Sequence, residues 1–321
     1  MCVVVACKLP VGPDGEDVFI ICKNRDRNYV PSIHFKKRTK GSLEYRYIED
    51  SDTTWTEGIN SAGICMVNAS LMVVDDEKEI SKKSKKSQGK ISHDAKIFKE
   101  ALKMRDVRKA AKHIADNDVM GYTLVTDGRE LYVVESVREW SKEVDPKTGK
   151  KYPVNERKSW RQVKDDEEFV VRTNHGTYFS ETGYPSGSPD GKSSRHRQEA
   201  VENAIKDRKP KTLAELLECM AVKPNKDANL NPLRKKGKCK LFTTGQYILN
   251  PFTKSMYYYP VPGSCKMIED GAQVSADDVV DKHDKTNMYV IDSYDEISTI
   301  GNIKEDVSFK TFFYSDWKGL N

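Results

Sequence analysis

Two short apolar runs at the start of the chain constrain its fold more than any other feature. Residues 3–8 and 18–22 are rich in β-branched side chains, and Gly-Pro-Asp-Gly at 12–15 separates them. Apolar β-branched runs divided by turn residues predict a β-hairpin. The end of the second run, Cys22-Lys-Asn-Arg-Asp-Arg27, should therefore return close to Cys2.

Strands and helices follow one another in blocks along the rest of the chain. Further strands are expected at 43–48, on both sides of 58–63, at 121–126, 130–136, 247–250 and 255–261. Helical spacing of apolar residues is expected at 97–104, 107–115, 195–206 and 212–220, the last with Thr212 as its N-cap. Such blocks predict a layered α+β fold rather than a regular βαβ alternation.

Composition limits the class of protein. The 54 Lys+Arg residues exceed the 49 Asp+Glu residues by a net charge of only +5, which argues against a dedicated nucleic-acid binder. No apolar stretch approaches the ~18–20 residues that a membrane span needs, and the N-terminus lacks the basic region of a signal peptide. The seven cysteines are odd in number and irregularly spaced, so a disulfide framework is not expected and the compartment should be reducing. We therefore expect a soluble, cytoplasmic protein.

The domain organisation is expected to be simple. Residues 1–321 are interpreted as a single domain with a charged insertion at about 140–168, which is typical of an extended hairpin or a surface insertion. The lysine-rich segment 78–90 is interpreted as a solvated connector, because it lacks the interleaved aromatic residues that stack on nucleic-acid bases. The clusters Tyr257-Tyr-Tyr259 and Phe312-Phe-Tyr314 are interpreted as sheet packing.

Cys2 is the most informative residue for chemistry. Removal of Met1, expected because the next side chain is small, would leave a first residue with both a thiol and a free α-amine. Their ordinary pKa values, about 8.5 and about 7.7–8.0, allow the amine to take the thiol proton and return it to a leaving group. The alternative is that a cysteine stands at position 2 by chance and is inert.

Other polar residues could complete a site around Cys2. Asp26 could hold an α-ammonium, and a neighbouring cation could lower the pKa of the thiol. Asn174 lies where a strand breaks into an irregular loop and offers an amide N–H to an oxyanion. His175 beside it is either a general base or a structural histidine. Ser193-Ser-Arg-His-Arg197 opens the expected helix, where an arginine can orient the site.

These motifs, in this order, resemble those of the cysteine N-terminal nucleophile hydrolases. The matching segments run from residue 2 to about residue 205, and a late hairpin near 243–259 also matches. In order, the motifs are Met-Cys, Lys-Asn-Arg-Asp, Thr-Glu-Gly-Ile-Asn-Ser-Ala-Gly-Ile followed by Asn68, Arg-Thr-Asn-His, and Ser-Ser-Arg before a helix. Within that superfamily the chain is most similar to the choloylglycine hydrolase and penicillin V acylase family and to the isopenicillin N acyltransferase-like family.

The resemblance implies a four-layer αββα sandwich and cleavage of a linear, non-peptide amide through an acyl-enzyme. By position it implies that Cys2 is nucleophile and base, and that Asp26 binds the α-amine. Asn68 and Asn174 would contribute to the oxyanion hole, and Arg195 would support the nucleophile. The bile-salt branch has arginine where this chain has Lys23, so either Lys23 or Arg25 would support the thiolate.

Several alternatives stay open at this point. Asn174-His175 is more similar to the acyltransferase branch, in which an amine replaces water as the acceptor. Asn24-Arg-Asp26 also resembles Met-Cys proteins with an Asn-Arg-Asp-Glu motif that are related to a Golgi-organisation factor, although Arg27 replaces the glutamate. A binding protein that kept the scaffold is the third reading. We expect no metal and no cofactor, because zinc-type cysteine spacing and a phosphate-binding glycine loop are both missing from the sequence. The expected partner is a small-molecule amide, and the resemblance leaves a homo-oligomer open.

Overall fold

The computed structural model describes residues 2–71, 93–140, 146, 153–180, 182–234, 237–260, 264, 266–269, 272–275 and 289–293. Helices in this part of the chain are α2 (His93–Ala101), α3 (Val107–Asp116), α4 (Pro189–Arg208) and α5 (Leu213–Met220), with short 3-10 turns at Pro13–Gly15 and Ala228–Leu230. The strands are β1 (Cys2–Leu9), β2 (Val18–Arg27), β3 (Ser32–Lys40), β4 (Leu43–Asp50), β5 (Thr56–Asn60), β6 (Cys65–Ala69), β7 (Gly121–Thr126), β8 (Leu131–Trp140), β9 (Pro153–Gln162), β10 (Phe169–Arg172), β11 (Phe242–Asn250), β12 (Ser255–Pro260), β13 (Lys266–Glu269), β14 (Ala272–Ser275) and β15 (Tyr289–Ser293).

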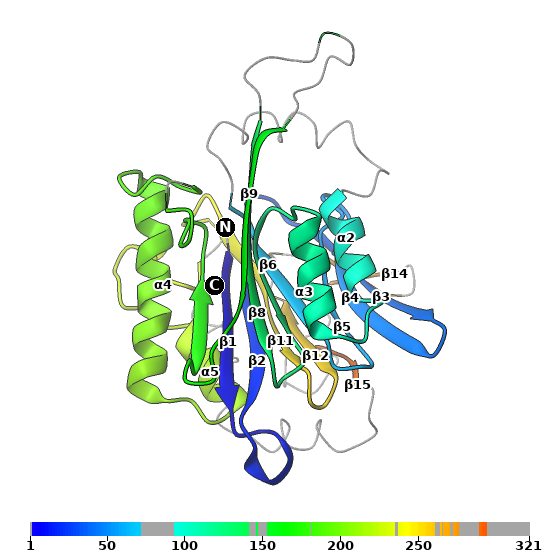
Figure 1. The fold of residues 1–321 in the computed structure, drawn as a ribbon. Helices are drawn as coiled ribbons and strands as arrows, with labels where there is room; N and C mark the ends of the chain where they lie inside the picture. Colours follow the sequence, from blue (N-terminus) through cyan, green and yellow to red (C-terminus); the bar gives the residue numbers. More distant parts are fainter. Residues whose placement is uncertain are drawn as a thin grey trace.

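The strands form two sheets (Figure 1). One has six strands in the order β10-β1-β2-β11-β12-β15, and the other has nine in the order β14-β13-β3-β4-β5-β6-β7-β8-β9. The described pairs are antiparallel, except that β13 runs parallel to β3. The α+β class is therefore confirmed.

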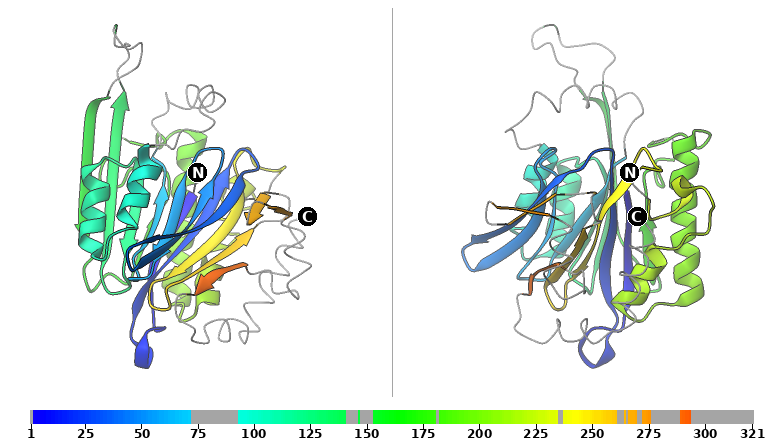
Figure 2. Two further views of the ribbon diagram at one scale, coloured as in Figure 1. Left: turned by 90° about the vertical axis from the view of Figure 1, so that its right-hand side faces the viewer. Right: turned by 180° about the vertical axis from the view of Figure 1, so that it is seen from behind.

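Apolar side chains lie on both faces of each sheet. One cluster, with Val4, Ile21 and Val67 among its members, fills the space between the two sheets. A second cluster joins the other face of β1 and β2 to α4 and α5, and a third joins the nine-stranded sheet to α2 and α3. Figures 1 and 2 show α4 and α5 beside the six-stranded sheet, and α2 and α3 on the far side of the nine-stranded sheet.

The hairpin predicted at the N-terminus is confirmed. β1 pairs with β2 over its whole length, from Leu9 opposite Val18 to Cys2 opposite Arg25. The sequence interpretation ended the second strand near Cys22, but β2 continues to Arg27 and buries Lys23, Asn24, Arg25 and Asp26. The polar motif is thus part of the sheet rather than a loop that follows it.

Two other expectations meet the structure directly. β8 and β9 form a long antiparallel hairpin from Tyr132 opposite Gln162 to Trp140 opposite Pro153. β9 lies within the segment 140–168, whose interpretation as an insertion stays a prediction. The basic connector at 78–90 and the cluster at 312–314 lie outside the described residues.

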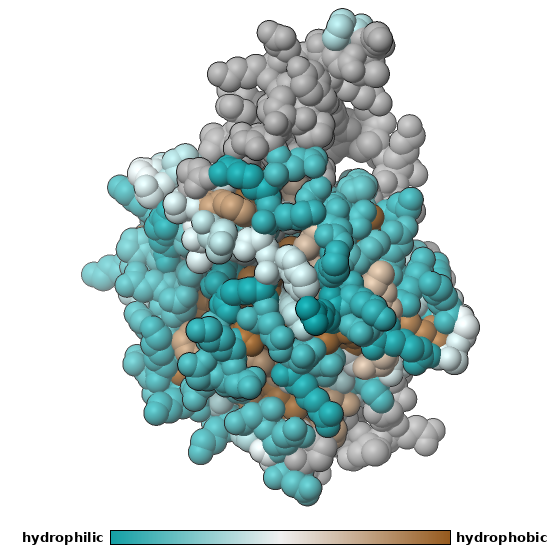
Figure 3. Space-filling model, in the orientation of Figure 1, coloured by the Kyte–Doolittle hydropathy of each residue, from teal (hydrophilic) through white to brown (hydrophobic). Residues whose placement is uncertain are grey.

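The face of the molecule drawn in Figure 3 is mainly hydrophilic. On the face drawn in Figure 3, hydrophobic residues are scattered among hydrophilic ones. Within the described part of the chain, the search for a helix with the length and hydropathy of a membrane span finds none.

Candidate active site

Cys2 is the first residue of β1, and its side chain is 4% exposed. Successive side chains of a strand point to opposite faces of a sheet. Cys2, Val4 and Ala6 belong to the cluster between the sheets, whereas Val3 and Val5 face the helices. The Cys2 thiol therefore lies between the two sheets, at one end of β1.

A row of three cations accompanies the thiol on the same face of the sheet. Lys23, Arg25 and Arg27 alternate along β2, and Arg25 is the residue directly opposite Cys2. Nη1 of Arg27 lies 3.9 Å from the Sγ of Cys2. The β-hairpin thus places every second side chain of the Lys-Asn-Arg-Asp-Arg motif next to the sulfur.

Two carboxylates of the nine-stranded sheet face this row. Lys23 pairs with Glu57 and donates a second hydrogen bond to the carbonyl of Asn68 at 2.6 Å. Asp50 receives Nη2 of Arg25 at 2.6 Å and Nε of Arg27 at 3.4 Å. Burial raises the pKa of Asp50, but Arg25 and Arg27 outweigh it and hold that pKa at about 2, so the carboxylate is charged.

The electrostatic surroundings favour a thiolate. Burial alone raises the pKa of the Cys2 thiol, but the positive charges of Lys23, the chain's amino terminus and Arg27 outweigh burial and the charge of Asp26. Together they lower the pKa of Cys2 from 9.0 to about 7. Burial, followed by Cys219 and the charges of Glu168 and Asp17, instead raises the pKa of Cys7 to about 12.

The backbone nitrogen of Cys2 is held by Asn174. It donates to Oδ1 of Asn174 at 2.8 Å, and Nδ2 of Asn174 donates to the carbonyl of Ser70 at 2.6 Å. The backbone N–H of Asn174 donates to Oγ of Ser194 at 2.9 Å. Strand β10 pairs with β1 up to Arg172 opposite Val4, so the chain reaches Asn174 alongside Cys2.

Asp26 lies on the face of β2 that packs against the helices. Its side chain points toward the helices, where Oδ1 accepts from Thr243 at 2.8 Å and Oδ2 lies 3.5 Å from Arg197 and 3.6 Å from Arg234. A bulge between Thr243 and Gly245 of β11 brings the threonine opposite Asp26. In the structure the nitrogen of Cys2 donates to Asn174, and the binding of a free α-amine by Asp26 stays a prediction.

The donors of Asn68 are already used. Its backbone N–H donates to Glu57 at 2.9 Å, and Nδ2 donates to Met120 at 3.1 Å and to Thr123 at 3.0 Å. Both amide hydrogens of the side chain therefore have acceptors, and the role of Asn68 in an oxyanion hole would require these bonds to be exchanged. Asn68 instead shapes the site by fixing Lys23 through its carbonyl.

Arg197, rather than Arg195, contacts the candidate nucleophile. Nη1 of Arg197 lies 3.4 Å from the carbonyl oxygen of Cys2, and Nη2 lies 3.4 Å from Oδ1 of Asn174. The helix α4 begins at Pro189 with Ser188 as its N-cap, so Ser193 does not open it as expected. Arg197 shares a helix face with Val201 and Ala204, which pack on the sheet, whereas Arg195 is half-buried and turned away from that face.

His175 belongs to a hydrogen-bonded group next to the site. Its Nδ1 lies 3.0 Å from the hydroxyl oxygens of both Thr173 and Ser194. Burial, followed by the charges of Arg195, Arg197 and Arg172, lowers the pKa of His175 to about 4. The histidine is therefore neutral at pH 7, and this arrangement supports its structural reading.

Four residues of the site were not identified from the sequence: Asp50, Glu57, Arg197 and Thr243. A signal existed for Arg197, because it stands four residues before Val201 and eight before Ile205 on the apolar side of the expected helix. Asp50 and Glu57 come from β4 and β5, which pack against the N-terminal hairpin from the other sheet, and such packing leaves no local pattern in the sequence.

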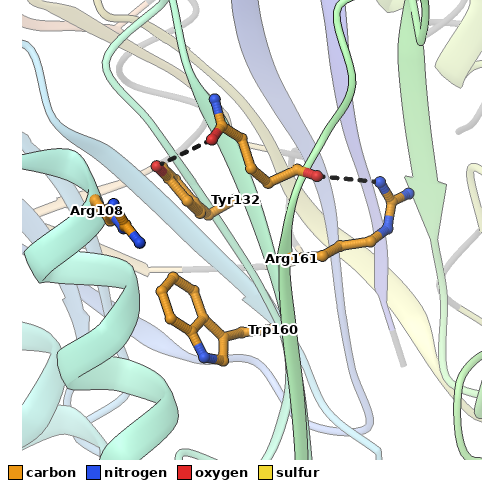
Figure 4. A pocket seen from close by; sticks show the side chains of 5 residues that line it. Arg108, Tyr132, Trp160 and Arg161 are labelled. Atoms are coloured by element: carbon orange, nitrogen blue, oxygen red, sulfur yellow. Dashed lines mark hydrogen bonds between the residues drawn. The ribbon is translucent and has the colours of Figure 1, made fainter.

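A separate pocket lies away from the thiol. It has a volume of about 220 Å³ and is lined by residues of α3, β8 and β9: Arg108, Tyr132, Trp160, Arg161 and Gln162 (Figure 4). Tyr132 packs in the cluster with α2 and α3, on the opposite face of the nine-stranded sheet from Cys2. In the described residues we find no group of three or more histidine, cysteine or acidic side chains that could hold a metal ion.

Comparison with known proteins gives a likeness of fold only. No protein-family model matches the chain, and no curated protein matches its sequence. The structure is similar to penicillin V acylase from Agrobacterium tumefaciens, with a TM-score of 0.44 and 12% identity over 81% of this chain and 84% of that one. It is also similar to a mutant of conjugated bile acid hydrolase from Clostridium perfringens, with a TM-score of 0.41 and 13% identity over 93% and 98% of the two chains.

Proposed function

We propose that this chain is an amidohydrolase of the N-terminal nucleophile type, which cleaves a linear, non-peptide amide through an acyl-enzyme on Cys2. The observation that carries the proposal is the arrangement at one end of β1. There a buried thiol has a pKa lowered to about 7, a cation at 3.9 Å and a backbone nitrogen held by a side-chain amide. A cysteine packed only for its apolar volume would need none of these partners.

Activation begins with the loss of Met1. The nitrogen that donates to Asn174 then becomes the α-amine, and the hydrogen bond at 2.8 Å orients its lone pair and hydrogens. The amine takes the proton of the thiol, either directly or through water. Lys23 and Arg27 stabilise the thiolate that forms.

The thiolate attacks the carbonyl carbon of the substrate. A C–S bond forms, the carbonyl electron pair moves to oxygen, and the negative charge leaves the sulfur for that oxygen. Among the described residues Nδ2 of Asn174 has one acceptor, the carbonyl of Ser70, so its second hydrogen can serve the oxyanion. Arg27, next to the sulfur, stabilises the negative charge as it moves from the sulfur to the oxygen.

The tetrahedral intermediate collapses when the C–N bond breaks. The α-ammonium gives its proton to the amine, and the amine departs. The acyl group stays on Cys2 as a thioester. Water then adds to the thioester carbonyl and releases the acid, and the thiol regains its proton. One residue thus acts as nucleophile and base, Asn174 holds its nitrogen and donates to the oxyanion, and Arg197 is a positioning residue.

The layered arrangement fits the same proposal. Helices pack on the outer face of each sheet and the thiol lies between the sheets, which is the αββα order implied by the resemblance of the motifs. At the start of β1 the nitrogen of Cys2 meets Asn174 and its thiol meets Arg27.

The experiment replaces Cys2 and compares it with a matched cysteine. Cys2→Ala should abolish turnover of a panel of chromogenic amides and leave the circular dichroism spectrum unchanged. Cys7→Ala, five residues along the same strand and facing the helices, should retain activity. Full activity of Cys2→Ala, or a wild-type protein that retains Met1 and cleaves no amide, would contradict the proposal. The second result would favour the binding protein.

A further inference from the structure

The row Lys23, Arg25 and Arg27 carries more positive charge than the facing carboxylates neutralise. Glu57 pairs with Lys23, and Asp50 alone serves both Arg25 and Arg27. Lys23, Arg25, Asp50 and Glu57 are at most 1% exposed, so water screens them little. The inter-sheet face of the site therefore holds one positive charge beyond its described carboxylates.

The Cys2 thiolate can balance this charge only in the resting enzyme. In the proposed acyl-enzyme the sulfur is a neutral thioester. A buried charge without a partner is costly, so the surplus charge of the row then calls for a second anion. The substrate itself is the component that arrives at this step.

Arg25 shows where that anion would bind. Only Nη2 of its guanidinium has a partner, namely Asp50, whereas Nε and Nη1 are buried and have no hydrogen-bond partner among the described residues. Buried polar groups are nearly always hydrogen-bonded, so two open nitrogens on one buried guanidinium point to a missing acceptor. Nε and Nη1 lie on different edges of the guanidinium, so each could donate its own charge-assisted hydrogen bond to an anionic group.

The position of Arg25 places the anion site close to Cys2. Arg25 is directly opposite Cys2 in the β1–β2 pair, on the same face of the sheet. Side chains of directly opposed residues are close neighbours. Arg27 is 17% exposed and is the member of the row that reaches the surface, so it marks the side from which a substrate approaches.

We propose that the substrate of this site carries an anionic group on its acyl part, and that Arg25 binds it with the help of Arg27. The assignment of the anion to the acyl part of the substrate rests on the proposed function. The anion site itself does not depend on turnover.

The first arm of the test uses alkylation of Cys2 and needs no substrate. The rates of reaction with iodoacetate, an anion, and iodoacetamide, its neutral analogue, are measured at pH 7 by peptide mapping. The reference is a Cys-Val-Val-Val-Ala peptide. The ratio of the iodoacetate rate to the iodoacetamide rate should exceed that of the peptide by about tenfold, the effect of one favourable charge contact.

Variants of the row should move this ratio in opposite directions. Arg25→Gln and the more exposed Arg27→Gln should lower it, Arg25→Lys should retain part of it, and Asp50→Asn should raise it, because that change removes a negative charge beside the arginines. Arg105→Gln, on an exposed residue between α2 and α3, serves as the control. A ratio equal to that of the peptide, and unaltered in Arg27→Gln and Asp50→Asn, would overturn the inference.

The second arm compares two amides of 7-amino-4-methylcoumarin that have acyl chains of equal length. The glutaryl amide should exceed the pentanoyl amide in kcat/KM by about tenfold or more, and Arg25→Gln should remove this preference. Equal cleavage of both would overturn the inference and leave the amidohydrolase standing. Cleavage of neither, together with the iodoacetate preference, would overturn the proposed function and leave the anion site standing.

Discussion

The nitrogen of Cys2 and the side chain of Asn174, which are 172 residues apart in sequence, form a buried hydrogen bond of 2.8 Å. Pairing of β10 with β1 enforces this contact, because the chain leaves Arg172 opposite Val4 and reaches Asn174 beside the first residue of β1. The second strand of the hairpin meanwhile brings Arg25 opposite Cys2. The two neighbours of β1 therefore assemble the site from opposite sides. The chain after β10 holds the nitrogen, and β2 places positive charge beside the sulfur.

Replacement of Asn174 should separate activity from stability. Asn174→Leu removes the acceptor of the Cys2 nitrogen and a donor available to the oxyanion, so kcat should fall by about a hundredfold or more. Asn60→Leu is the matched control, since Asn60 is equally buried but binds the carbonyls of Leu102 and Met104. It should lower the melting temperature and leave kcat of the folded enzyme within a few-fold. Equal kcat losses in the two variants would contradict the role of Asn174.

Lys23 should set the pH at which Cys2 becomes reactive. The rate of alkylation of Cys2 by iodoacetamide should rise with pH and level off above the pKa of about 7. Lys23→Met removes a positive charge that favours the thiolate, so the pKa must rise and the curve must move to higher pH. High salt should move the curve of the wild type only slightly, because Lys23 is buried and salt screens its charge little. An unchanged curve in Lys23→Met would show that the lysine does not act on the thiol.

Substitutions of Arg197 and Arg195 test which arginine of α4 supports the site. Arg197 contacts the carbonyl oxygen of Cys2 and the side chain of Asn174, so Arg197→Met should reduce kcat strongly and lower the unfolding temperature. Arg195→Met, on the same helix, should change both much less. The comparison is made with purified proteins of equal helix content. A larger loss of kcat in Arg195→Met would restore the assignment implied by the motif.

Asp50 should support the fold in a pH-dependent way. The pKa of Asp50 in the folded protein, about 2, lies below its ordinary value of 3.8. Its contribution to stability is therefore complete above pH 4 and is lost as pH falls toward 2. Asp50→Asn leaves Arg25 and Arg27 without this counter-charge, and the free energy of unfolding at pH 7 should fall by about 3 kcal/mol.

Chemical unfolding between pH 2 and pH 7 measures this effect. The stability of Asp50→Asn should vary less than that of the wild type between pH 4 and pH 2. Asp207→Asn, on an exposed residue of α4, should follow the wild type over the whole range. Parallel curves for Asp50→Asn and the wild type would refute the charged state assigned to Asp50.

Local patterns were sufficient for much of the fold. The β-branched runs and the turn at 12–15 predict the first hairpin, and Thr212 with Glu215 forms the capping box that begins α5. Strand β3, from Ser32 to Lys40, was not identified, because four of its nine residues are lysine or arginine and such residues are depleted in strands. Its place between β4 and β13 compensates for that weak propensity.

The site was harder to predict than the fold. The order of the motifs predicted a site that includes Cys2, Lys23 and Asn174. The structure brings these three residues together. The partners of Asp26 could not be read from spacing, since Arg197, Arg234 and Thr243 meet only when α4 and β11 pack on the hairpin. The alternation of β2 explains the difference, because Asp26 faces the helices while Lys23 and Arg25 face the thiol.

Competitive thiol labelling at pH 6.5, followed by peptide mapping of the purified protein, tests the central claim most directly. It shows whether Met1 has been removed and how fast each of the seven cysteines reacts. We predict that Cys2 begins the chain and reacts well before Cys7, Cys22, Cys65 and Cys219, whose thiol pKa values are raised by burial. A retained Met1, or a Cys2 that reacts no faster than these four, would contradict the account.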